Sequence, residues 1–446
     1  MRPPAMGAPL DAAVPPAAMT YQVRAKSLLR HMSWLDMVML FAWVLSTALP
    51  LTWAQPLRFL GAAYFCASMI LFAPQTMPTV VRALPAFILP VMCLVSAMWA
   101  PAPGDAIRKG ILLALTAIPA IYAASRLSGR QILLVFFLVE SIAAVMTVMQ
   151  PNPVGGAWTG MFGQKNFLAV NIFILFACAM ALVLDRGSKH WIRLAALAML
   201  PVSVFIILMA KSATTTLLLL GAGAAMLGHS FLWKPAARVR HMRILLLLAV
   251  AAMAIGAVLL LFGLMQFDAM GQLLDALGKD STLTGRTYLW QTAERVMAEK
   301  PLTGVGAEGF WRPEFGAANS ITEYFFYDRY VRFSFHSSYL ENGVSFGYPG
   351  YWATVFVAVW AIVRTFLNWA RNQTIINGAF LVLAVMIIIR STAEIDLAQE
   401  FAGTAVLLFI GALRWEKLEA RPSAPRPATA LMPRAPTPRQ AHRDPA

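Results

Sequence analysis

The sequence predicts an all-α, polytopic integral membrane protein with about 12 transmembrane helices and one long periplasmic loop. Of its 446 residues, 59% are hydrophobic and only 13% are charged, whereas about a quarter of the residues in a soluble domain are charged. Uncharged runs such as 244–265 are long enough, as helices, to cross a hydrocarbon core of roughly 30 Å. These observations exclude an ordinary soluble globular protein.

Apolar segments follow one another along most of the chain. The expected spans are 37–53, 59–73, 83–99, 111–124, 132–149, 167–184, 194–210, 213–231, 244–265, 346–363, 375–389 and 397–413. Residues 35–267 therefore hold spans 1 to 9, and residues 344–413 hold spans 10 to 12. Because Pro74 follows the second span closely and the last span is short, about ten to twelve spans are expected.

The formal charge of +15 is explained by an uneven distribution of Lys and Arg between alternate connections. If the N-terminus is cytoplasmic, the cytoplasmic connections hold most basic residues: Arg82, Arg126, Arg130, Arg186, Lys189, Arg193, Lys234, Arg238, Arg240, Arg243, Arg364 and Arg371. The positive-inside rule then places both termini in the cytoplasm and the loop 268–343 in the periplasm. These cations would contact the anionic inner leaflet, so we expect no nucleic-acid partner.

The two ends of the chain, residues 1–34 and 414–446, are expected to be largely disordered cytoplasmic tails. They are rich in Pro, Ala and Arg and lack apolar periodicity. No removable signal peptide is recognised before the first span, which should itself direct insertion. The three cysteines lie in apolar runs, so we expect neither a disulfide nor a thiolate metal site.

The loop 268–343 is the long hydrophilic passage of the apolar region, and we expect the chemistry to occur there. Thr284 or Ser281 can cap a helix whose apolar residues recur at helical spacing until Pro301. This helix would lie on the membrane surface with Arg286 in its first turn.

His336 is the candidate catalytic base of the loop. Of six histidines, it alone is expected on the periplasmic side. It directly precedes the run Ser337–Glu341 and the return of the chain to the bilayer, which places the imidazole near headgroup depth. Imidazole is the side chain best matched to proton transfer near neutral pH. The alternative is a solvated loop histidine without a chemical role.

Three cations, Lys211, Arg286 and Arg390, are expected at the outer membrane face. Each alone could be a snorkelling residue. Together they could line an anion site such as one for a diphosphate, to which Arg offers a two-pronged contact and Lys a point charge. Glu394 is expected to orient Arg390 rather than to take part in acid–base chemistry.

These motifs resemble the O-antigen ligase and bacterial polysaccharide polymerase superfamily. The resemblance rests on the number of spans, the late periplasmic loop, and the runs Gly285–Trp290, Pro301–Gly306 and His336–Glu341. Two further runs, Phe162–Asn166 and Lys211–Thr214, resemble the exopolysaccharide branch, which contains succinoglycan-type polymerases.

The resemblance implies an inverting, metal-independent glycosyltransferase that uses polyprenyl diphosphate-linked glycans and needs no cofactor. A glycosyl diphosphate requires positive charge at its leaving group and a base at the acceptor hydroxyl. His336 would be this base, and Arg286, Lys211 and Arg390 would bind the diphosphate. Supporting roles would fall to Glu394, Lys165, Asn166 and Glu341.

The resemblance favours a polymerase of the bacterial inner membrane over an O-antigen ligase. Ligases often have Arg near the position of Lys211 and Asn where this chain has Ser337, and they transfer the glycan to lipid A core or protein. A flippase and a chain-length regulator would be further partners, besides membrane lipid. A secondary transporter is a rival of another class, but the charged candidates lie at the outer face and no half-repeat is found. An assembly protein is a third alternative.

Overall fold

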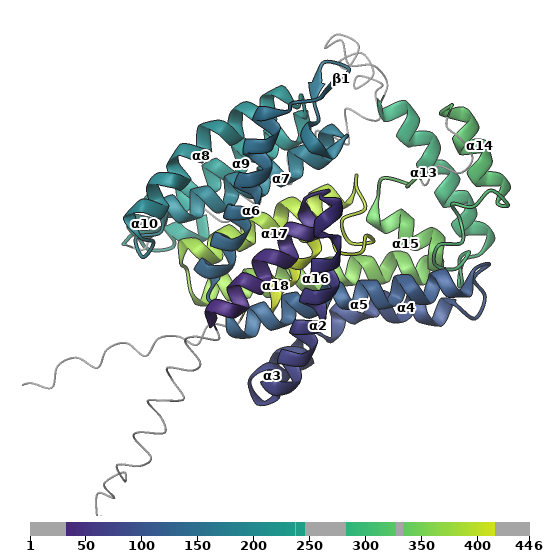
Figure 1. Cartoon of the computed structure of the whole chain (residues 1–446), viewed down its shortest axis with the longest axis horizontal. Coiled ribbons are helices and arrows are strands. Elements are labelled where there is room, and N and C mark those ends of the chain that lie inside the picture. The colour runs from purple at the N-terminus through teal and green to yellow at the C-terminus, as the bar shows by residue number, and fades with distance from the viewer. Residues whose placement is uncertain (1–32, 237, 246–281, 327–332, 415–446) are drawn as a thin grey trace, which may run out of the picture. The chain divides into compact units, whose positions relative to one another are not determined.

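The computed structural model describes residues 33–236, 238–245, 282–326 and 333–414. This part of the chain is almost entirely helical, as predicted (Figure 1). Its described strands form one antiparallel hairpin, in which β1 (Pro153–Val154) pairs with β2 (Ala157–Trp158). Most of both predicted tails and of the predicted span 244–265 lies outside the described residues, whereas residues 33 and 34 begin the first helix.

The helices follow the predicted apolar segments in order. Before the long loop they are Ser33–Ala48, η1 (Thr52–Ala54), α2 (Gln55–Leu71), α3 (Ala73–Arg82), η2 (Leu84–Phe87), α4 (Ile88–Ser96), α5 (Pro103–Arg126), α6 (Gly129–Met149), η3 (Gly160–Phe162), α7 (Lys165–Leu184), α8 (His190–Met209), α9 (Ala213–Phe231) and α10 (Trp233–Ala236). In and after the loop they are α13 (Thr282–Glu299), α14 (Gly316–Tyr324), α15 (Ser338–Phe346), α16 (Tyr348–Arg371), α17 (Ile375–Ser391) and α18 (Gly403–Leu413).

Five of the described helices, α5, α6, α7, α8 and α16, are long and apolar enough to cross a membrane. The helix Thr52–Leu71, which comprises η1 and α2, forms a bent pair with α3, and this pair makes a sixth span if it is counted as one. The protein is therefore a multi-pass membrane protein, whereas the expected number of about twelve spans stays a prediction.

Three predicted spans differ from the helices that form. The second is followed by a bend of 109° into α3, whose first turn contains a proline, a residue that suits a helix start. The third is divided into η2 and the nine-residue α4. The last begins at Gly403 instead of Leu397. Residues 392–402 before it form a connection that is hydrogen-bonded to the start of α15.

We call the end of the bundle at which α7 begins and α17 ends the site end. Exposed tryptophans mark both ends of the bundle. Trp53, Trp99 and Trp352 lie near the site end and are 66%, 41% and 63% exposed, and Trp34 and Trp191 lie near the opposite end and are 68% and 63% exposed. Tryptophan is enriched at the two membrane–water interfaces. This distribution agrees with a bilayer that surrounds the helices between the two sets.

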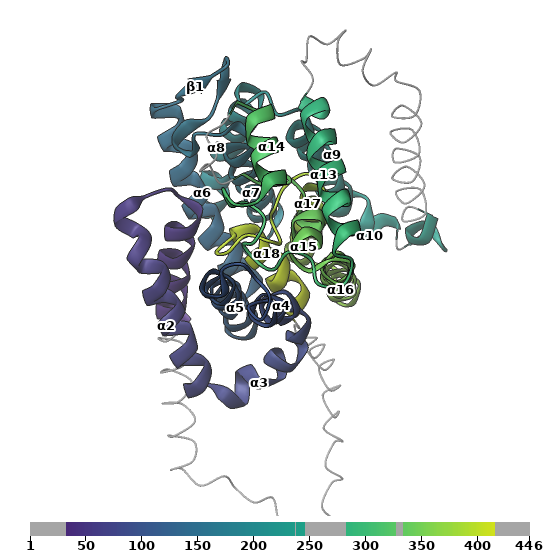
Figure 2. The same cartoon turned by 90° about the vertical axis from the view of Figure 1, so that its right-hand side faces the viewer.

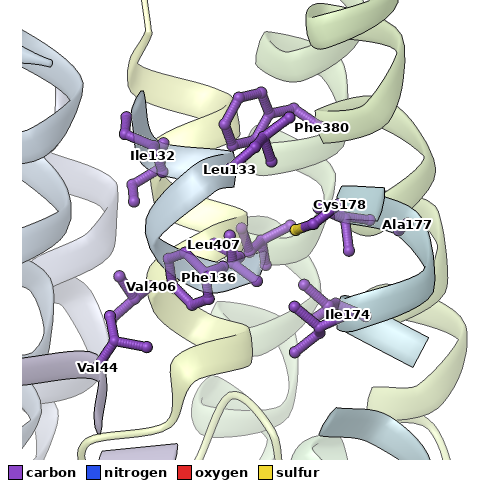
Figure 3. Close-up of a cluster of buried hydrophobic side chains, with 14 of the residues drawn as sticks. Val44, Ile132, Leu133, Phe136, Ile174, Ala177, Cys178, Phe380, Val406 and Leu407 are labelled. Atoms are coloured by element: carbon purple, nitrogen blue, oxygen red, sulfur yellow. The ribbon is translucent and has the colours of Figure 1, made fainter. Parts of the chain in front are cut away.

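The core of the bundle is built around α7, which is 83% buried over its most apolar window. Ile174, Ala177 and Cys178 of this helix pack with Phe136 of α6 and Leu407 of α18 (Figure 3). Within lipid, close packing of this kind is a main source of helix association, since the lipid tails are as apolar as the side chains. The packing fixes the starts of α7 and α18 relative to the end of α17, which is where the polar site forms.

The loop after residue 281 contains a second apolar core of its own. The predicted helix is present as α13, and its Leu289 and Val296 pack against Phe310, Ile321 and Phe335. In Figure 2, α13 and α14 are seen at the site end, across the ends of the membrane helices. The described part of the loop is thus a packed unit and not an irregular connection.

The run Pro301–Gly306 fastens this unit to α15. The amide groups of Val305 and Gly306 donate hydrogen bonds to the carbonyls of Val344 and Ser345 at 3.0 and 2.9 Å. Gly304 has a φ of +61°, and a Cβ there would lie 2.5 Å from the backbone of residues 344–346. Glycine is therefore required by both the close approach and the positive φ.

The orientation of the bundle generates a first prediction. Because the described basic connections lie mainly at the end opposite the site end, a reporter fused after Arg238 should report a cytoplasmic location and one fused after Ala318 a periplasmic one. Paired alkaline phosphatase and fluorescent-protein fusions measure this. A cytoplasmic signal from the Ala318 fusion would contradict the expected orientation.

Candidate functional site

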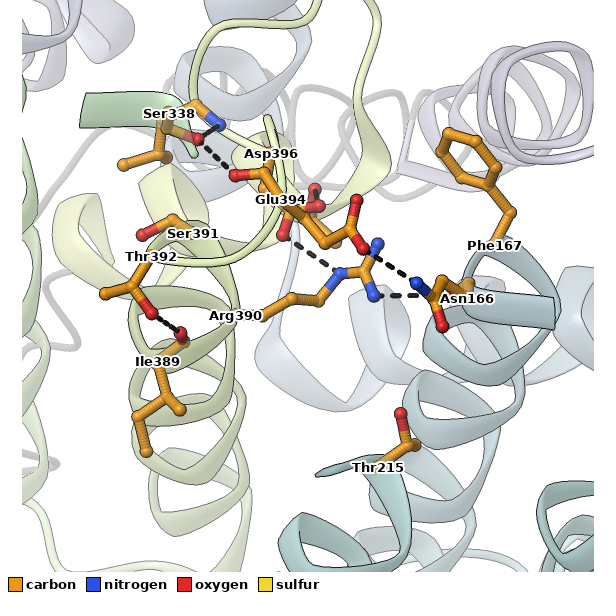
Figure 4. A network of polar contacts seen from close by, with 12 residues as sticks. Asn166, Phe167, Thr215, Ser338, Ile389, Arg390, Ser391, Thr392, Glu394 and Asp396 are labelled. Carbon is orange, nitrogen blue, oxygen red and sulfur yellow. Dashed lines mark hydrogen bonds and ion pairs between the residues drawn. The ribbon is translucent and has the colours of Figure 1, made fainter. Parts of the chain in front are cut away.

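The carboxylate of Glu394 is the centre of a polar group at the site end. Its Oε1 accepts a hydrogen bond from Asn166 Nδ2 at 2.9 Å and lies 3.4 Å from Arg286 Nη2. Its Oε2 lies 3.5 Å from His336 Nδ1. Figure 4 shows the contact between Glu394 and Asn166. The three partners come from α7, from α13 and from the residue pair before α15, so the carboxylate joins three distant parts of the chain.

Glu394 is only 9% exposed, yet its neighbours favour its charged form. Burial alone would raise its pKa, but the hydrogen bond from His336 and the positive charges of Arg390 and Arg286 outweigh burial and lower the pKa below its usual value. An ionised carboxylate beside Nδ1 of His336 accepts the N–H at that atom, which leaves Nε2 available to take a proton. The geometry therefore suits an oriented imidazole base.

The backbone at His336 is held in an unusual conformation, with φ at +48°. Non-glycine residues rarely adopt this region, and such strain is concentrated at functional sites. The preceding residue is fixed from two sides, because Phe335 accepts a hydrogen bond from Trp290 Nε1 at 3.0 Å and donates one to Glu341 Oε2 at 2.9 Å. These two bonds keep the imidazole at Glu394.

The run that follows His336 docks the start of α15 onto the connection after α17. The hydroxyl of Ser337 caps the helix by accepting a hydrogen bond from the amide of Leu340. The fully buried Ser338 donates from both its amide and its hydroxyl to the carbonyl of Glu394, at 3.0 and 2.9 Å, and its hydroxyl accepts from the amide of Leu397 at 3.1 Å. These bonds place His336 and Glu394 next to each other.

Glu341 braces this arrangement from the loop unit. Besides the amide of Phe335, it binds Trp311 Nε1 at 2.9 Å, and burial raises its pKa above the usual value. Close by, the ammonium of Lys109 on α5 forms an ion pair with Glu308 at 2.6 Å. Glu341 thus holds the backbone next to His336; its supporting role in the reaction stays a prediction.

Arg390 lies in a different environment from the one expected. Its Nε pairs with Asp396 at 3.0 Å, and its Nη1 donates to the carbonyl of Asn166 at 3.3 Å (Figure 4). The side chain is 10% exposed, compared with 26% for Arg286. The expectation that Glu394 mainly orients Arg390 needs correction, because Glu394 contacts Arg286 and His336 and Asp396 pairs with Arg390.

The two candidate lysines lie apart from the contacts of Glu394. Lys165, the first residue of α7, is exposed. Lys211 is also exposed, has a φ of +51°, and places its Nζ 3.3 Å from where a Cβ on Gly156 would lie. Both lysines are at the site end, but within the described residues neither makes a hydrogen bond or ion pair with Glu394 or His336.

The charges at the site indicate the kind of ligand it can hold. Among the described residues, no three His, Cys, Asp or Glu side chains are grouped as ligands for a metal ion. Arg286 is partly exposed and bears a planar, two-pronged donor, which is suited to phosphate oxygens. The site therefore brings an anion-binding candidate, Arg286, and a base candidate, His336, to the same carboxylate of Glu394.

The sequence analysis identified the charged residues of the site. It missed the residues whose hydrogen bonds fix the position of His336. Trp290 was recognised as an apolar residue of its helix, but its indole hydrogen bond to Phe335 depends on tertiary packing. Its position four residues after Arg286 was a usable signal, because residues at that spacing share a helix face. Trp311 and Ser338 carried no comparable signal.

The helices and this polar group define a membrane-embedded protein with a potential reaction centre at one end of its bundle. The O-antigen ligase family model matches residues 197–355, a range that contains Lys211, Arg286 and His336. The exopolysaccharide production protein ExoQ of Rhizobium meliloti is 27% identical over 340 residues, which cover 73% of this chain and 75% of the relative.

Together the two matches support the O-antigen ligase and bacterial polysaccharide polymerase superfamily for this chain, and the similarity to ExoQ supports its exopolysaccharide branch. They support a membrane protein of the O-antigen ligase and polymerase type in polysaccharide synthesis. The family predicted from the motifs is thereby confirmed.

The lowered pKa of Glu394 generates a second prediction. Because its folded pKa lies below its usual value, the stability it contributes is fully present above about pH 4.3 and is lost as the pH falls through the folded pKa. Glu394→Gln should therefore cost about 1–3 kcal/mol at pH 7, and this difference should shrink on acidification. Thermal unfolding of both purified proteins between neutral and acidic pH measures it. A difference that stays constant with pH would show that the charge of Glu394 contributes nothing.

Proposed function

We propose that the protein is a polysaccharide polymerase that joins polyprenyl diphosphate-linked glycan units into a surface polysaccharide. The observation that carries the proposal is the pairing of both His336 and Arg286 with the buried carboxylate of Glu394. The base candidate His336 contacts one carboxylate oxygen of Glu394, and the diphosphate-binding candidate Arg286 contacts the other. The O-antigen ligase family match and the similarity to ExoQ support a glycosyl transfer reaction at this place.

The reaction is a single displacement at the anomeric carbon of the donor glycan. The acceptor hydroxyl oxygen forms the new bond to this carbon as the bond to the diphosphate oxygen breaks. The electron pair leaves with the diphosphate, and the hydroxyl proton passes to Nε2 of His336. Because attack comes from the face opposite the leaving group, the anomeric configuration is inverted.

Arg286 is proposed to bind the leaving diphosphate. It has 26% of its side chain exposed, which leaves donors available beyond its contact with Glu394. A diphosphate leaves as an anion that needs positive charge rather than a proton, so guanidinium groups can take the place of a metal ion. Lys211 and Lys165 at the site end would add charge around the same substrate, and Arg390 would act mainly by holding Asn166.

The acceptor decides between polymerase and ligase. The departure from the ligase pattern at Lys211 and Ser337, and the similarity to ExoQ over most of both chains, favour another lipid-linked repeat unit as acceptor. The O-antigen ligase family match favours lipid A core or protein as the alternative acceptor. Supplying both acceptors to the purified protein separates the two activities by the product formed.

The cellular setting follows from this chemistry. We propose an inner-membrane location with both termini cytoplasmic and residues 268–343 in the periplasm, where the flipped lipid-linked glycan is found. Residues 35–267 and 344–413 would form the membrane scaffold around this loop. A flippase would supply the substrate, and a chain-length regulator would act on the product.

Arg286 provides a third prediction. Arg286→Ala should abolish polymer formation, and Arg286→Lys should restore little of it, because the two-pronged donor is lost while the charge is kept. Polymer is measured from purified protein and a lipid diphosphate-linked repeat unit. Arg295→Ala, an exposed arginine on the same helix, is the matched control and should behave as wild type. Wild-type polymer levels from Arg286→Ala would remove the diphosphate role.

His336 provides a fourth prediction. His336→Ala should leave the protein folded while transfer falls by about 10²–10⁴-fold, and His336→Gln should be nearly as poor, because an amide does not accept a proton at neutral pH. Initial rates with and without a chelator measure both the base role and metal independence. His190→Ala, an exposed histidine at the opposite end, is the control. Normal polymerisation by His336→Gln would reduce His336 to a positioning residue, and chelator-sensitive wild-type activity would point to a metal.

A further inference from the structure

A continuous row of aromatic rings leads away from His336 through the loop unit. The imidazole lies 5.4 Å from the ring of Phe333, which lies 5.4 Å from Phe325. Phe325 contacts Tyr324 at 5.1 Å, and Tyr324 contacts Tyr288 of α13 at 4.6 Å. We call these five side chains the ring row.

Two aromatic side chains near the far end of the row are exposed. Tyr324 is 51% exposed, and its neighbour Phe326 is 96% exposed. Phe326 also has a φ of +57°, a conformation that is unfavourable for a bulky side chain. Neither burial nor backbone preference explains this residue, and its exposed ring can stack against a ligand.

The position of α14 favours a glycan over lipid as the occupant. In Figure 1, α14 lies at the outer edge of the site end, on the side of α13 away from the membrane helices, and Figure 2 looks onto it. Lipid would surround the sides of the bundle rather than this outer edge. A pyranose ring offers a flat C–H face for stacking and a rim of hydroxyls, which matches rings that carry tyrosine hydroxyls.

We propose that the ring row and Phe326 form a subsite that stacks against the sugar rings of the acceptor glycan. The inference rests on the proposed function, in which His336 takes the proton from the acceptor hydroxyl and the acceptor therefore lies next to His336. Since the row begins at the imidazole, a sugar stacked on Phe333 and Phe325 lies in line with the group that takes the hydroxyl proton. Tyr324 and Phe326 hold the next sugars of the same chain.

Binding to the purified full-length protein in lipid nanodiscs tests the subsite. The probe is the free oligosaccharide released by mild acid from the lipid-linked repeat unit of cells that lack this protein. Calorimetry should show that Tyr324→Ala and Phe326→Ala each weaken binding by about five- to tenfold, whereas Tyr324→Phe keeps the ring and binds nearly as wild type. In the polymerisation assay the two alanine variants should raise the KM for the acceptor and leave kcat unchanged.

Tyr348→Ala is the control, since Tyr348 is a 45% exposed tyrosine at the site end of α16 and lies outside the row. Unchanged oligosaccharide binding in both alanine variants would overturn the subsite, whether or not His336 is the base. Unchanged sugar binding together with weaker attachment to phospholipid vesicles would overturn it in favour of a membrane anchor. Weaker binding alongside a fully active His336→Gln protein would support the subsite and remove only the base role.

Discussion

The charge of Glu394 is the constraint on which the polar end of the protein depends. A buried carboxylate is costly unless it is paired, and here Asn166, Arg286 and His336 supply the pairing. These partners belong to a membrane helix and to both ends of the loop unit, so satisfying one charge assembles the site. Ahead of α18, the carbonyl of Glu394 and the amide of Leu397 bond to Ser338 of α15 instead of to a helix of their own.

The loop unit gives the site a rigid support. The close approach of Gly304 and the bonds of Glu341 join this unit to α15. The Lys109–Glu308 ion pair fastens it to α5. A base acts efficiently only when its position is fixed to within about half an ångström by the surrounding shell. In a reaction between two lipid-linked chains, which diffuse in the membrane, the protein must supply this fixed geometry, and the strained backbone of His336 is consistent with it.

Local sequence patterns predicted the parts of the structure that depend on local physics. Hydropathy located the helices, and helical spacing located α13, because both signals repeat within one segment. His336 and Arg286 were predicted from motif and charge, and the structure brings both to Glu394. The pairing of Arg390 with Asp396 was not found, and neither was the separation of Lys211 from Glu394, because such contacts are decided by how distant helices pack. The shortening of the third and last spans was not predicted for the same reason, since an apolar composition does not show where a tertiary hydrogen bond ends a helix.

The most direct measurement is a cryo-electron microscopy structure of the His336→Ala protein in nanodiscs with a bound lipid diphosphate-linked repeat unit. The substitution slows transfer so that the substrate remains intact. We expect the diphosphate within hydrogen-bonding distance of Arg286 and the first sugar beside residue 336 and Glu394. A diphosphate bound elsewhere, with the Arg286–Glu394 contact unchanged, would contradict the central claim that this carboxylate organises the reaction site.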